Sequence, residues 1–320
     1  MGKAVLKLDN RIVRRVFDRP EKRRKDERKM YVLYNPMAGN GHGEEKAREI
    51  EKKVQGQKIE YRDVTRMDAA DFLARLPMEE TVVLAGGDGT LNHFINRYGS
   101  SVLNRPLYYF PAGSGNDFWN DVGQNSVDGM ILLNDYLKNL PVVEVKGKKS
   151  WFLNGIGYGI DGYCCEMGDQ MRMQGKENVN YTSIAIKGLL FHFKPASATV
   201  TVDGVSHRYR HVWLAPTMNG RYYGGGMEVA PAQNRLNQNG TVSVVVLHCP
   251  SKLKTLMVFP SIFKGEHVKH TEMVEVLSGK EITVAFDRPT ALQIDGETVT
   301  GVTEYGVMAD ADSTDQSVAV

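Results

Sequence analysis

The sequence predicts two domains: an N-terminal three-layer α/β domain with a parallel sheet, and a C-terminal antiparallel β-sandwich. Two observations lead to this prediction. From residue 30, short apolar runs alternate with amphipathic stretches, as in parallel βαβ units. After about residue 140, the chain changes to β-rich runs broken by Gly, Pro and Asp, which is typical of antiparallel sheets.

The apolar runs of the first domain predict strands, each followed by an amphipathic stretch with helical spacing. In parallel α/β domains, ligands bind at the edge where the carboxyl ends of the strands meet. We therefore expect functional residues in the loops that follow these strands. The expected strands are 31–36, 59–64, 81–85 and 106–110, with helices at 43–54 and 68–76.

The predicted domain limits follow the same change of pattern. We expect the α/β domain over 30–140 and the sandwich over 141–298, the latter interrupted by helices. A basic arm precedes the first domain, and the last residues lack an apolar period and are expected to be disordered. The arm is 1–29, the tail is 309–320, and the expected helices of the sandwich lie near 162–173, 179–191 and 251–263.

Composition excludes several protein classes. The chain has 320 residues, 42% hydrophobic and 24% charged, as a globular protein does. Its 40 Lys and Arg against 38 Asp and Glu give a net charge of +2, so we expect no nucleic-acid partner. The three cysteines lack zinc-ligand spacing, which favours a reducing cytoplasm. No apolar run approaches the ~20 residues of a membrane span, so a lipid substrate would be met at a membrane surface.

The balanced charge hides a basic segment. Residues 11–29 hold ten basic and four acidic side chains, or +6, which leaves 30 basic and 34 acidic groups, or −4, elsewhere. Ile12, Val13, Val16 and Phe17 share one helical face, so peripheral membrane contact at the inner face of the membrane is one interpretation. A solvated arm is the other, because the apolar face is only two turns long.

The run TVVLAGGDGT at 81–90 is the most informative motif. Its apolar strand ends in Gly86, Gly87, Asp88, Gly89 and Thr90, and helical spacing follows. Glycines let backbone N–H groups approach a polyphosphate, and an aspartate there can hold the metal that neutralises it. The alternative is an ordinary tight turn between strand and helix.

Two further loops strengthen the phosphate-binding interpretation. The segment 34–43 contains an Asn-Pro pair followed by Gly39 and Gly41, and 109–118 contains Gly-Ser-Gly-Asn-Asp. All three loops follow strands of the same predicted sheet, so they should converge at one edge. The sequence contains no GxxxxGK[ST] motif, so metal and backbone groups would carry more of the charge neutralisation.

Seven motifs together resemble the diacylglycerol kinase catalytic family, which includes soluble bacterial diacylglycerol kinases and ceramide and sphingosine kinases. The resemblance extends over roughly residues 30–308. The motifs, in the order in which that family has them, are YNPMAG, GGDGT, PAGSGND, NGIGYGID, GGGMEVAP, FPSIFKGEH and IDGE.

The resemblance implies specific roles. Asp88, Asp117 and Asp161 would organise Mg²⁺, with Asp88 and Glu297 as catalytic residues, and Glu297 would be the base that takes the proton of the lipid hydroxyl. The segment 299–308 would return to the first domain. The implied ATP-binding residues are Asn35, Pro36, Gly39, Thr65, Gly86, Gly87, Gly89, Thr90, Ser114 and Asn116.

Besides Ser114, which stands where a threonine is usual and keeps the hydroxyl, three positions depart from the pattern of this family. His93 stands where a glutamate is usual, and Asn120 where an arginine is common. Asn239 replaces an aspartate that helps to hold a second, structural magnesium in one bacterial branch, so we do not expect that metal here.

The expected function is an ATP-dependent lipid kinase that uses Mg²⁺ to phosphorylate a hydroxyl of diacylglycerol or a related lipid. A catalytically weak nucleotide- or lipid-binding relative with a regulatory role is one alternative, kept open by the three departures. An NAD kinase-like phosphotransferase is the other, since it shares the GGDG turn. The sequence leaves a homodimer open.

Overall fold

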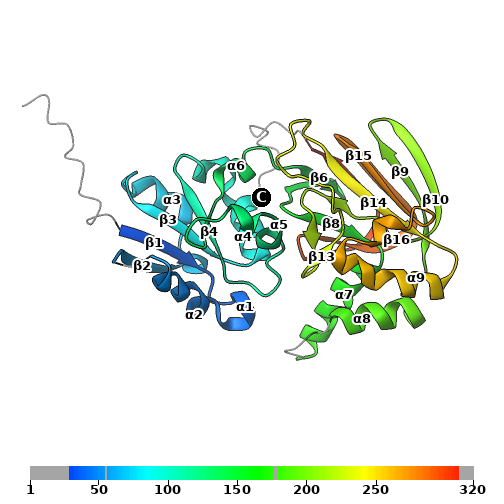
Figure 1. Ribbon diagram of the computed structural model, residues 1–320, viewed down its shortest axis with the longest axis horizontal. Coiled ribbons are helices and arrows are strands. Elements are labelled where there is room, and N and C mark those ends of the chain that lie inside the picture. Colours follow the sequence, from blue (N-terminus) through cyan, green and yellow to red (C-terminus); the bar gives the residue numbers. More distant parts are fainter. Residues whose placement is uncertain (1–28, 55, 176–178, 180, 310–320) are drawn as a thin grey trace, which may run out of the picture.

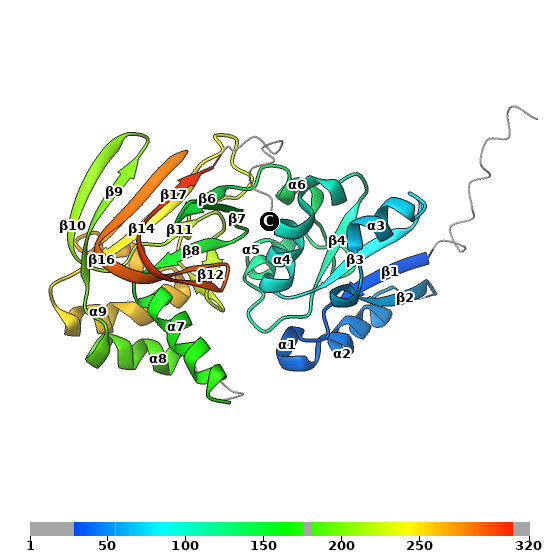
Figure 2. The same ribbon diagram turned by 180° about the vertical axis from the view of Figure 1, so that it is seen from behind.

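The computed structural model describes residues 29–54, 56–175, 179 and 181–309. They form two domains that lie side by side in both views of the ribbon (Figures 1 and 2). The expected arm lies outside the described residues except for Lys29, and so does the expected tail except for Ala309.

The N-terminal domain contains a five-stranded sheet in the order β2-β1-β3-β4-β5. Four strands are parallel, and the short β5 pairs antiparallel with β4. The expected strands are therefore confirmed to within a few residues. They are β1 (Lys29–Tyr34), β2 (Lys58–Asp63), β3 (Thr81–Gly86), β4 (Leu107–Pro111) and β5 (Ile131–Leu132).

Helices cover both faces of this sheet because its central strand is apolar on both sides. Along β3, Val82 and Leu84 belong to one buried cluster, and Val83 and Ala85 to another. The period of two in a strand produces this alternation, so a continuous apolar run indicates a sheet buried between two layers. The helical segments are α1 (Ala38–Gly41), α2 (Gly43–Arg48), η3 (Glu49–Lys52), η4 (Val64–Arg66), α3 (Ala69–Arg75), α4 (Asp88–Tyr98), η5 (Gly99–Val102), α5 (Asp117–Val122), η6 (Gly123–Asn125) and α6 (Asn134–Leu137).

The C-terminal domain is built on a ten-stranded sheet in the order β7-β6-β17-β16-β8-β11-β14-β10-β9, with β15 paired to β14. All its pairings are antiparallel, as expected. The strands are β6 (Val142–Val145), β7 (Lys148–Trp151), β8 (Gly155–Tyr158), β9 (Ala196–Val202), β10 (Val205–Leu214), β11 (Thr217–Met218), β14 (Val242–His248), β15 (Val274–Gly279), β16 (Glu281–Ile294) and β17 (Glu297–Met308), and β12 (Tyr222–Tyr223) and β13 (Met227–Glu228) form a separate hairpin.

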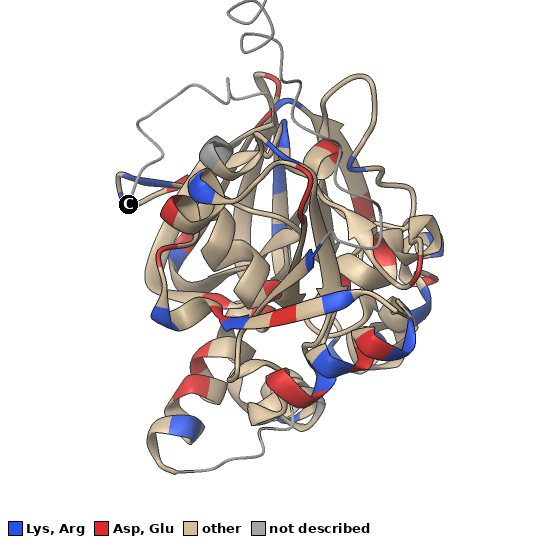
Figure 3. Ribbon diagram, turned by 90° about the vertical axis from the view of Figure 1, so that its left-hand side faces the viewer, with Lys and Arg blue, Asp and Glu red and all other residues tan. Residues whose placement is uncertain are grey.

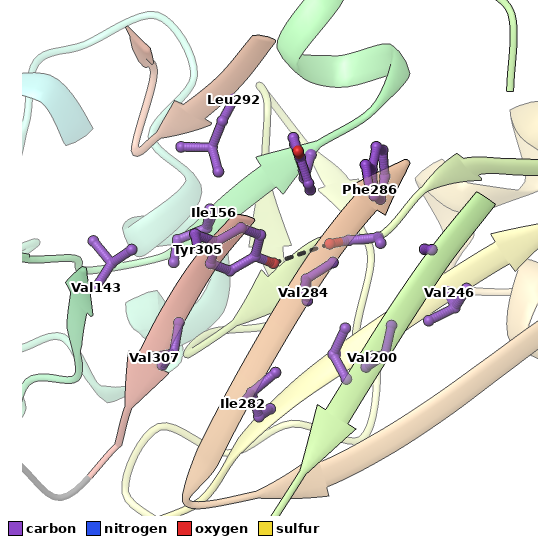
Figure 4. Packing of buried hydrophobic residues seen from close by; sticks show 14 of the residues in the cluster. Val143, Ile156, Val200, Val246, Ile282, Val284, Phe286, Leu292, Tyr305 and Val307 are labelled. Atoms are coloured by element: carbon purple, nitrogen blue, oxygen red, sulfur yellow. Dashed lines mark hydrogen bonds between the residues drawn. The ribbon is translucent and has the colours of Figure 1, made fainter. Parts of the chain in front are cut away.

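The long strand β16 folds this sheet over on itself. Its first half pairs with β9, its second half pairs with β8, and the register shifts between Ala285 and Thr290. A strand that changes partners at such an irregularity makes the corner between two layers. The residues between the layers form one apolar core around Tyr305, whose hydroxyl donates to the Ala215 carbonyl over 3.1 Å (Figure 4).

One expected boundary is wrong. The segment 299–308 does not return to the first sheet, because β17 pairs with β16 and with β6 in the second sheet. In the second half of this strand, Val302, Tyr305 and Val307 join the core of the C-terminal domain. The segment therefore belongs to the β domain.

A group of helices covers one side of the second sheet. Their inner faces share a second buried cluster with Trp213 and Leu247 of the sheet. The expected helices in this domain are confirmed, although the second and third each change to a tighter or wider turn near their ends. They are α7 (Ile160–Met173), α8 (Tyr181–Lys187) with the π-helical turn η7 (Gly188–His192), α9 (Lys252–Val258) with η8 (Phe259–Lys264), and η9 (His267–Lys269).

The surface fits the balanced composition. On the N-terminal domain, Lys and Arg are interspersed with Asp and Glu (Figure 3). Helix α2 and η3 pair these charges along one face, for example Arg48 with Glu44 and Glu51. None of the described helices has the length and apolarity to cross a membrane.

His267, in the FPSIFKGEH motif, is a buried polar residue. It is fully enclosed, and its Nε2–H donates to the Val229 carbonyl over 3.0 Å. Its Nδ1 has no partner among the described residues. Burial lowers the pKa of His267 from its usual 6.5 to about 4, so the ring is neutral in the folded protein.

This histidine should make the protein less stable in mild acid. The unfolded chain binds the proton more tightly than the folded one, so stability is lost as pH falls from about 6.5 toward 4. Between about pH 7 and pH 5, we expect the free energy of unfolding in urea to fall by roughly 2 kcal/mol more in the wild type than in His267→Gln. The exposed His192→Gln is the matched control, and an equal pH dependence in the wild type and His267→Gln would contradict the prediction.

Candidate active site

Three glycine-containing loops meet at the carboxyl edge of the first sheet, as the sequence predicts. The loop after β3 and the loop after β4 touch through their backbones, since a Cβ on Gly113 would lie 2.4 Å from the Gly87 Cα. Only glycine at both positions permits this approach. The Ala112 N–H also donates to the Gly86 carbonyl over 2.8 Å, which fixes the two loops together.

The loop after β1 joins the other two through side chains. The Asn35 amide donates to the Thr90 hydroxyl over 2.9 Å. Lys46, on α2, donates from Nζ to the Gly113 carbonyl over 3.0 Å. Its ammonium group also lies beside Gly39, where a Cβ would approach it to 2.7 Å. A cationic side chain therefore lies between two of the three loops.

Asp88 is the hub of the contacts between α4 and α5. Its two carboxylate oxygens accept hydrogen bonds from the N–H groups of Asp117 and Phe118 over 2.9 and 2.8 Å. These donors belong to the first turn of α5, so Asp88 caps this helix from another element. Its Oδ1 also accepts from the Asn154 amide of the second domain over 2.9 Å.

Asp117 connects the site to the glycine run at 224–226. The N–H groups of Gly225 and Gly226 donate to its two oxygens over 2.8 and 2.7 Å. Burial, followed by the adjacent charge of Asp88, raises the pKa of Asp117 to about 7. The site thus holds two neighbouring carboxylates, and Asp117 exchanges its proton near neutral pH.

Asp295, the aspartate of the IDGE motif, fastens the second domain to the first. Its carboxylate accepts from the N–H groups of Leu153, Asn154 and Gly155 within 3.0 Å. It also accepts from the Asn92 amide of α4 over 2.7 Å. Four donors on one carboxylate join the β16–β17 turn, the start of β8 and the helix after the GGDGT turn.

Two ion pairs of Asp121 also join the domains. Asp121 of α5 is buried and binds Arg221 and Arg235 of the second domain, each over 2.7 Å. Arg235 is itself buried, with a side chain only 3% exposed, and lies over the ring of Phe118. The two guanidinium groups compensate the desolvated carboxylate, so the domains are held in one arrangement.

Asp161 lies apart from the other two predicted metal ligands, at the first turn of α7. Its Oδ2 accepts from the Tyr223 hydroxyl over 2.6 Å. Its Oδ1 is buried and has no hydrogen-bond partner among the described residues. Burial raises the pKa of Asp161 to about 6.

Glu297 begins β17, two residues after Asp295, and its side chain is exposed. The turn before it is an Asp-Gly hairpin in which both residues have positive φ. The next residue, Thr298, donates to Asp169 of α7 over 2.7 Å. The position of Glu297 is therefore fixed from both sides, while its carboxylate stays accessible.

The carboxylates fit a hydrated Mg²⁺ that is shared with a phosphate. Mg²⁺ commonly takes one or two carboxylates and completes its shell with water and substrate oxygens. The oxygens of Asp117 accept one hydrogen bond each and keep lone pairs free. Within the described ranges, no group of three His, Cys, Asp or Glu side chains could hold an ion by itself. The assignment of Asp88, Asp117 and Asp161 to one metal stays a prediction.

The other predicted residues have less specific surroundings. The Thr65 hydroxyl, exposed at the end of β2, donates to Asp63 over 2.6 Å. Asn116 has a positive φ and closes its own loop by accepting from the Gly113 N–H over 3.0 Å. Ser114 and Gly89 are exposed at the same edge.

The positions that depart from the family pattern also lie at the surface. His93, Asn120 and Asn239 are all exposed. The vicinal cysteines are packing residues, because burial raises the pKa of both thiols and Cys164 belongs to the core beneath α7.

Sequence reasoning missed Asp295, Lys46 and Asn154. The groups that donate hydrogen bonds to the Asp295 carboxylate lie 140 to 203 residues away along the chain. For Lys46, the only available signal was a lysine on the helix that follows the Asn-Pro loop. The glycine run at 224–226, which belongs to the GGGMEVAP motif, lies against Asp117.

Comparison with known proteins agrees with the two-domain architecture. The profile of the diacylglycerol kinase catalytic domain matches residues 29–141. The profile described as YegS C-terminal NAD kinase beta sandwich-like domain matches residues 154–308. A diacylglycerol kinase from Mycobacterium tuberculosis (strain CDC 1551 / Oshkosh) is 26% identical over 279 residues, which cover 83% of this chain and 87% of that protein.

Solved structures share the fold. A crystal structure of a diacylglycerol kinase from Bacillus anthracis str. Sterne has a TM-score of 0.51 at 16% identity, covering 88% of this chain and 94% of that chain. A second structure from the same organism reaches 0.56 at 17% identity, covering 88% and 92%.

The hydrogen bonds of Asp295 predict that a single substitution at this position strongly destabilises the protein. Asp295→Asn would replace one acceptor oxygen with a donor that faces N–H groups, and we expect a loss of roughly 3 kcal/mol in the free energy of unfolding. Asp203→Asn is the matched control, because Asp203 also stands in an Asp-Gly hairpin but is exposed and accepts at Oδ1 from the N–H groups of Lys280 and Glu281. Urea unfolding measures both variants, and equal losses would show that the contact between the domains adds nothing.

Proposed function

Because the chain belongs to the diacylglycerol kinase catalytic-domain family, we propose that it transfers the γ-phosphoryl group of Mg-ATP to a hydroxyl of diacylglycerol or a related lipid. One observation carries the proposal. Three glycine-containing loops and two adjacent carboxylates meet where the two domains touch, and the accessible Glu297 follows the turn whose Asp295 is bonded to both domains. A phosphoryl donor and an alcohol acceptor need these groups at one place.

The donor would bind on the N-terminal domain. Backbone N–H groups of the three loops and the start of α4 favour phosphate oxygens. Lys46 adds a positive charge between the loops. Asp88 and Asp117 are the residues that would hold Mg²⁺, which when bound neutralises charge on the transferring phosphoryl group.

The acceptor would approach from the C-terminal domain. Glu297 would take the proton of the lipid hydroxyl while the hydroxyl oxygen forms a bond to the γ-phosphorus. The bond between that phosphorus and the bridging oxygen then breaks, and ADP leaves with its electron pair. The Asp295 turn and the Thr298 hydrogen bond would position this base, so both domains contribute to a single reaction.

Transfer from labelled ATP is the direct test. We expect label in diacylglycerol or another hydroxylated lipid, and none in NAD or sugar phosphates, when the purified protein is given each acceptor with Mg²⁺. Glu297→Gln should lower kcat by at least roughly a hundredfold and leave the KM for ATP unchanged, as loss of a general base does. ATP binding without transfer to any lipid would favour the regulatory alternative, and near-normal kcat in Glu297→Gln would remove its role.

Lys46 should contribute to binding the phosphates of ATP rather than its adenosine part. Lys46→Met is expected to weaken ATP binding roughly tenfold, or about 1.4 kcal/mol, and to leave adenosine binding unchanged. Lys52→Met, which removes an exposed lysine of the adjoining η3, is the matched control. Calorimetry with both ligands measures the difference, and an equal loss for adenosine would indicate that the lysine acts only by holding the loops.

A further inference from the structure

Large apolar side chains are exposed together on the outer face of α8, η7, α9 and η8. Phe191 is 73% exposed, and Leu253 and Met257 are each 67% exposed. Six of the fifteen exposed large apolar side chains found in the described residues lie in these four short elements. They are Ile186, Leu190, Phe191, Leu253, Met257 and Phe263, and we call them the apolar face.

These side chains are not poorly packed core residues. The inner faces of the same elements already fill the second core, through Leu189, Phe193, Val258 and Ile262. Turn η7 also packs against α9, so the two helical segments form one continuous surface. Both views of the ribbon place α8 and α9 at the same end of the C-terminal domain (Figures 1 and 2). These elements therefore have two apolar faces, one buried in the core and one exposed to solvent.

Within the segments that carry the apolar face, all the charges are basic, and Glu266 and Glu272, which follow the second segment, are each paired with a lysine. The segments 181–194 and 251–264 contain five lysines and no aspartate or glutamate. One of these lysines, Lys254, pairs with Glu272 over 2.8 Å. The remaining four are exposed, namely Lys187, Lys194, Lys252 and Lys264. On the N-terminal domain, by contrast, acidic and basic groups are mixed (Figure 3).

We propose that the apolar face, with its surrounding lysines, docks the protein onto an anionic phospholipid bilayer. Helices that lie in a membrane interface insert apolar side chains and place lysines among the headgroups. Lysine side chains are long enough to keep their ammonium groups at the surface while their methylenes stay apolar. This inference rests on the proposed function, which requires that the substrate be reached in a membrane.

A second copy of this chain fits the face less well. Self-association through it would bring together two sets of lysines on segments that carry no acidic side chain, and like charges across an interface repel each other. The bilayer supplies both the negative headgroups and the apolar interior.

The face is also connected to the candidate site. Helix α7 carries Asp161 in its first turn, and α8 and η7 pack against this helix. The Glu297 hairpin is bonded to the same helix through Thr298 and Asp169. Docking through α8 and α9 would therefore hold the acceptor side of the site, not the nucleotide side, toward the membrane.

Sedimentation with vesicles tests the proposal without requiring catalysis. The full chain is mixed, without ATP, with vesicles of phosphatidylcholine alone or of phosphatidylcholine and phosphatidylglycerol in equal parts. The triple variant Phe191→Ser, Leu253→Ser and Met257→Ser should bind the anionic vesicles about tenfold or more weakly than the wild type. The double variant Lys187→Gln and Lys252→Gln should lose binding to anionic vesicles and keep the weak binding to neutral ones.

Matched controls separate this face from other surfaces. Val205→Ser with Leu236→Ser removes exposed apolar side chains elsewhere and should leave binding unchanged. The basic arm is present in every variant, so it cannot cause a difference between them. Thermal melting should match the wild type, because all the substituted side chains are exposed.

The outcomes are distinct. Wild-type vesicle binding by the folded triple variant would overturn the proposal, and so would a wild-type dimer that the triple variant converts to a monomer in sedimentation velocity. Turnover of a vesicle-borne lipid should fall in the triple variant while turnover of a dispersed short-chain lipid is unchanged. Normal vesicle binding without any lipid phosphorylation would instead overturn the proposed function and leave the docking face standing.

Discussion

The carboxylate of Asp295 is the contact on which the site depends. It occupies a turn with positive φ and receives four N–H groups, three from the start of β8 and one from Asn92 of α4. By fixing the backbone at Asn154, it helps to position the amide that donates to Asp88. Asp88 in turn caps α5, whose first residue, Asp117, holds the glycine run. One chain of hydrogen bonds that begins at this turn thus connects the two domains to the site, and the ion pairs of Asp121 with Arg221 and Arg235 hold the same arrangement.

The same chain of contacts concentrates negative charge. Asp88, Asp117 and Asp295 are close enough for the charges of the first and the last to raise the pKa of Asp117, in addition to its burial. Most of the donors to these carboxylates are backbone N–H groups, which stabilise them but carry no net charge. A polyphosphate would add further negative charge at this edge. Under the proposed function, it must therefore arrive with a cation, and Lys46 supplies only one of the positive charges that are needed.

The sequence predicted what depends on local pattern. The apolar run of β3 and the glycines after it were sufficient to place a buried strand, a turn and a helix, and three such turns were sufficient to place a site at one edge of the sheet. Contacts between distant segments were not predictable in this way. Asp295 and Asn92 are separated by 203 residues, and nothing near either one indicates its partner. The sheet that β17 joins was predicted wrongly for the same reason. Its apolar residues fit either sheet, and the pairing with β6 determines which sheet it joins. The helix that contains Asp161 was expected near 162–173, but the partner of Asp161, Tyr223, comes from a different hairpin.

The two domains differ in how their helices meet solvent, and this difference is consistent with two kinds of ligand. On the N-terminal domain, helix surfaces carry paired charges such as Arg48 with Glu44, which favour water on that side. On the C-terminal domain, α8 and α9 bury one apolar face in the core and expose another to solvent. Exposing large apolar side chains costs solvation free energy, which burial in another phase would recover. A protein that takes a polyanion from water and an acceptor from a bilayer would need this division. Helix α7, which carries Asp161 in its first turn, packs against α8 and η7 and is bonded to the Glu297 hairpin, so under both proposals it would connect the docking face to the acceptor side of the site.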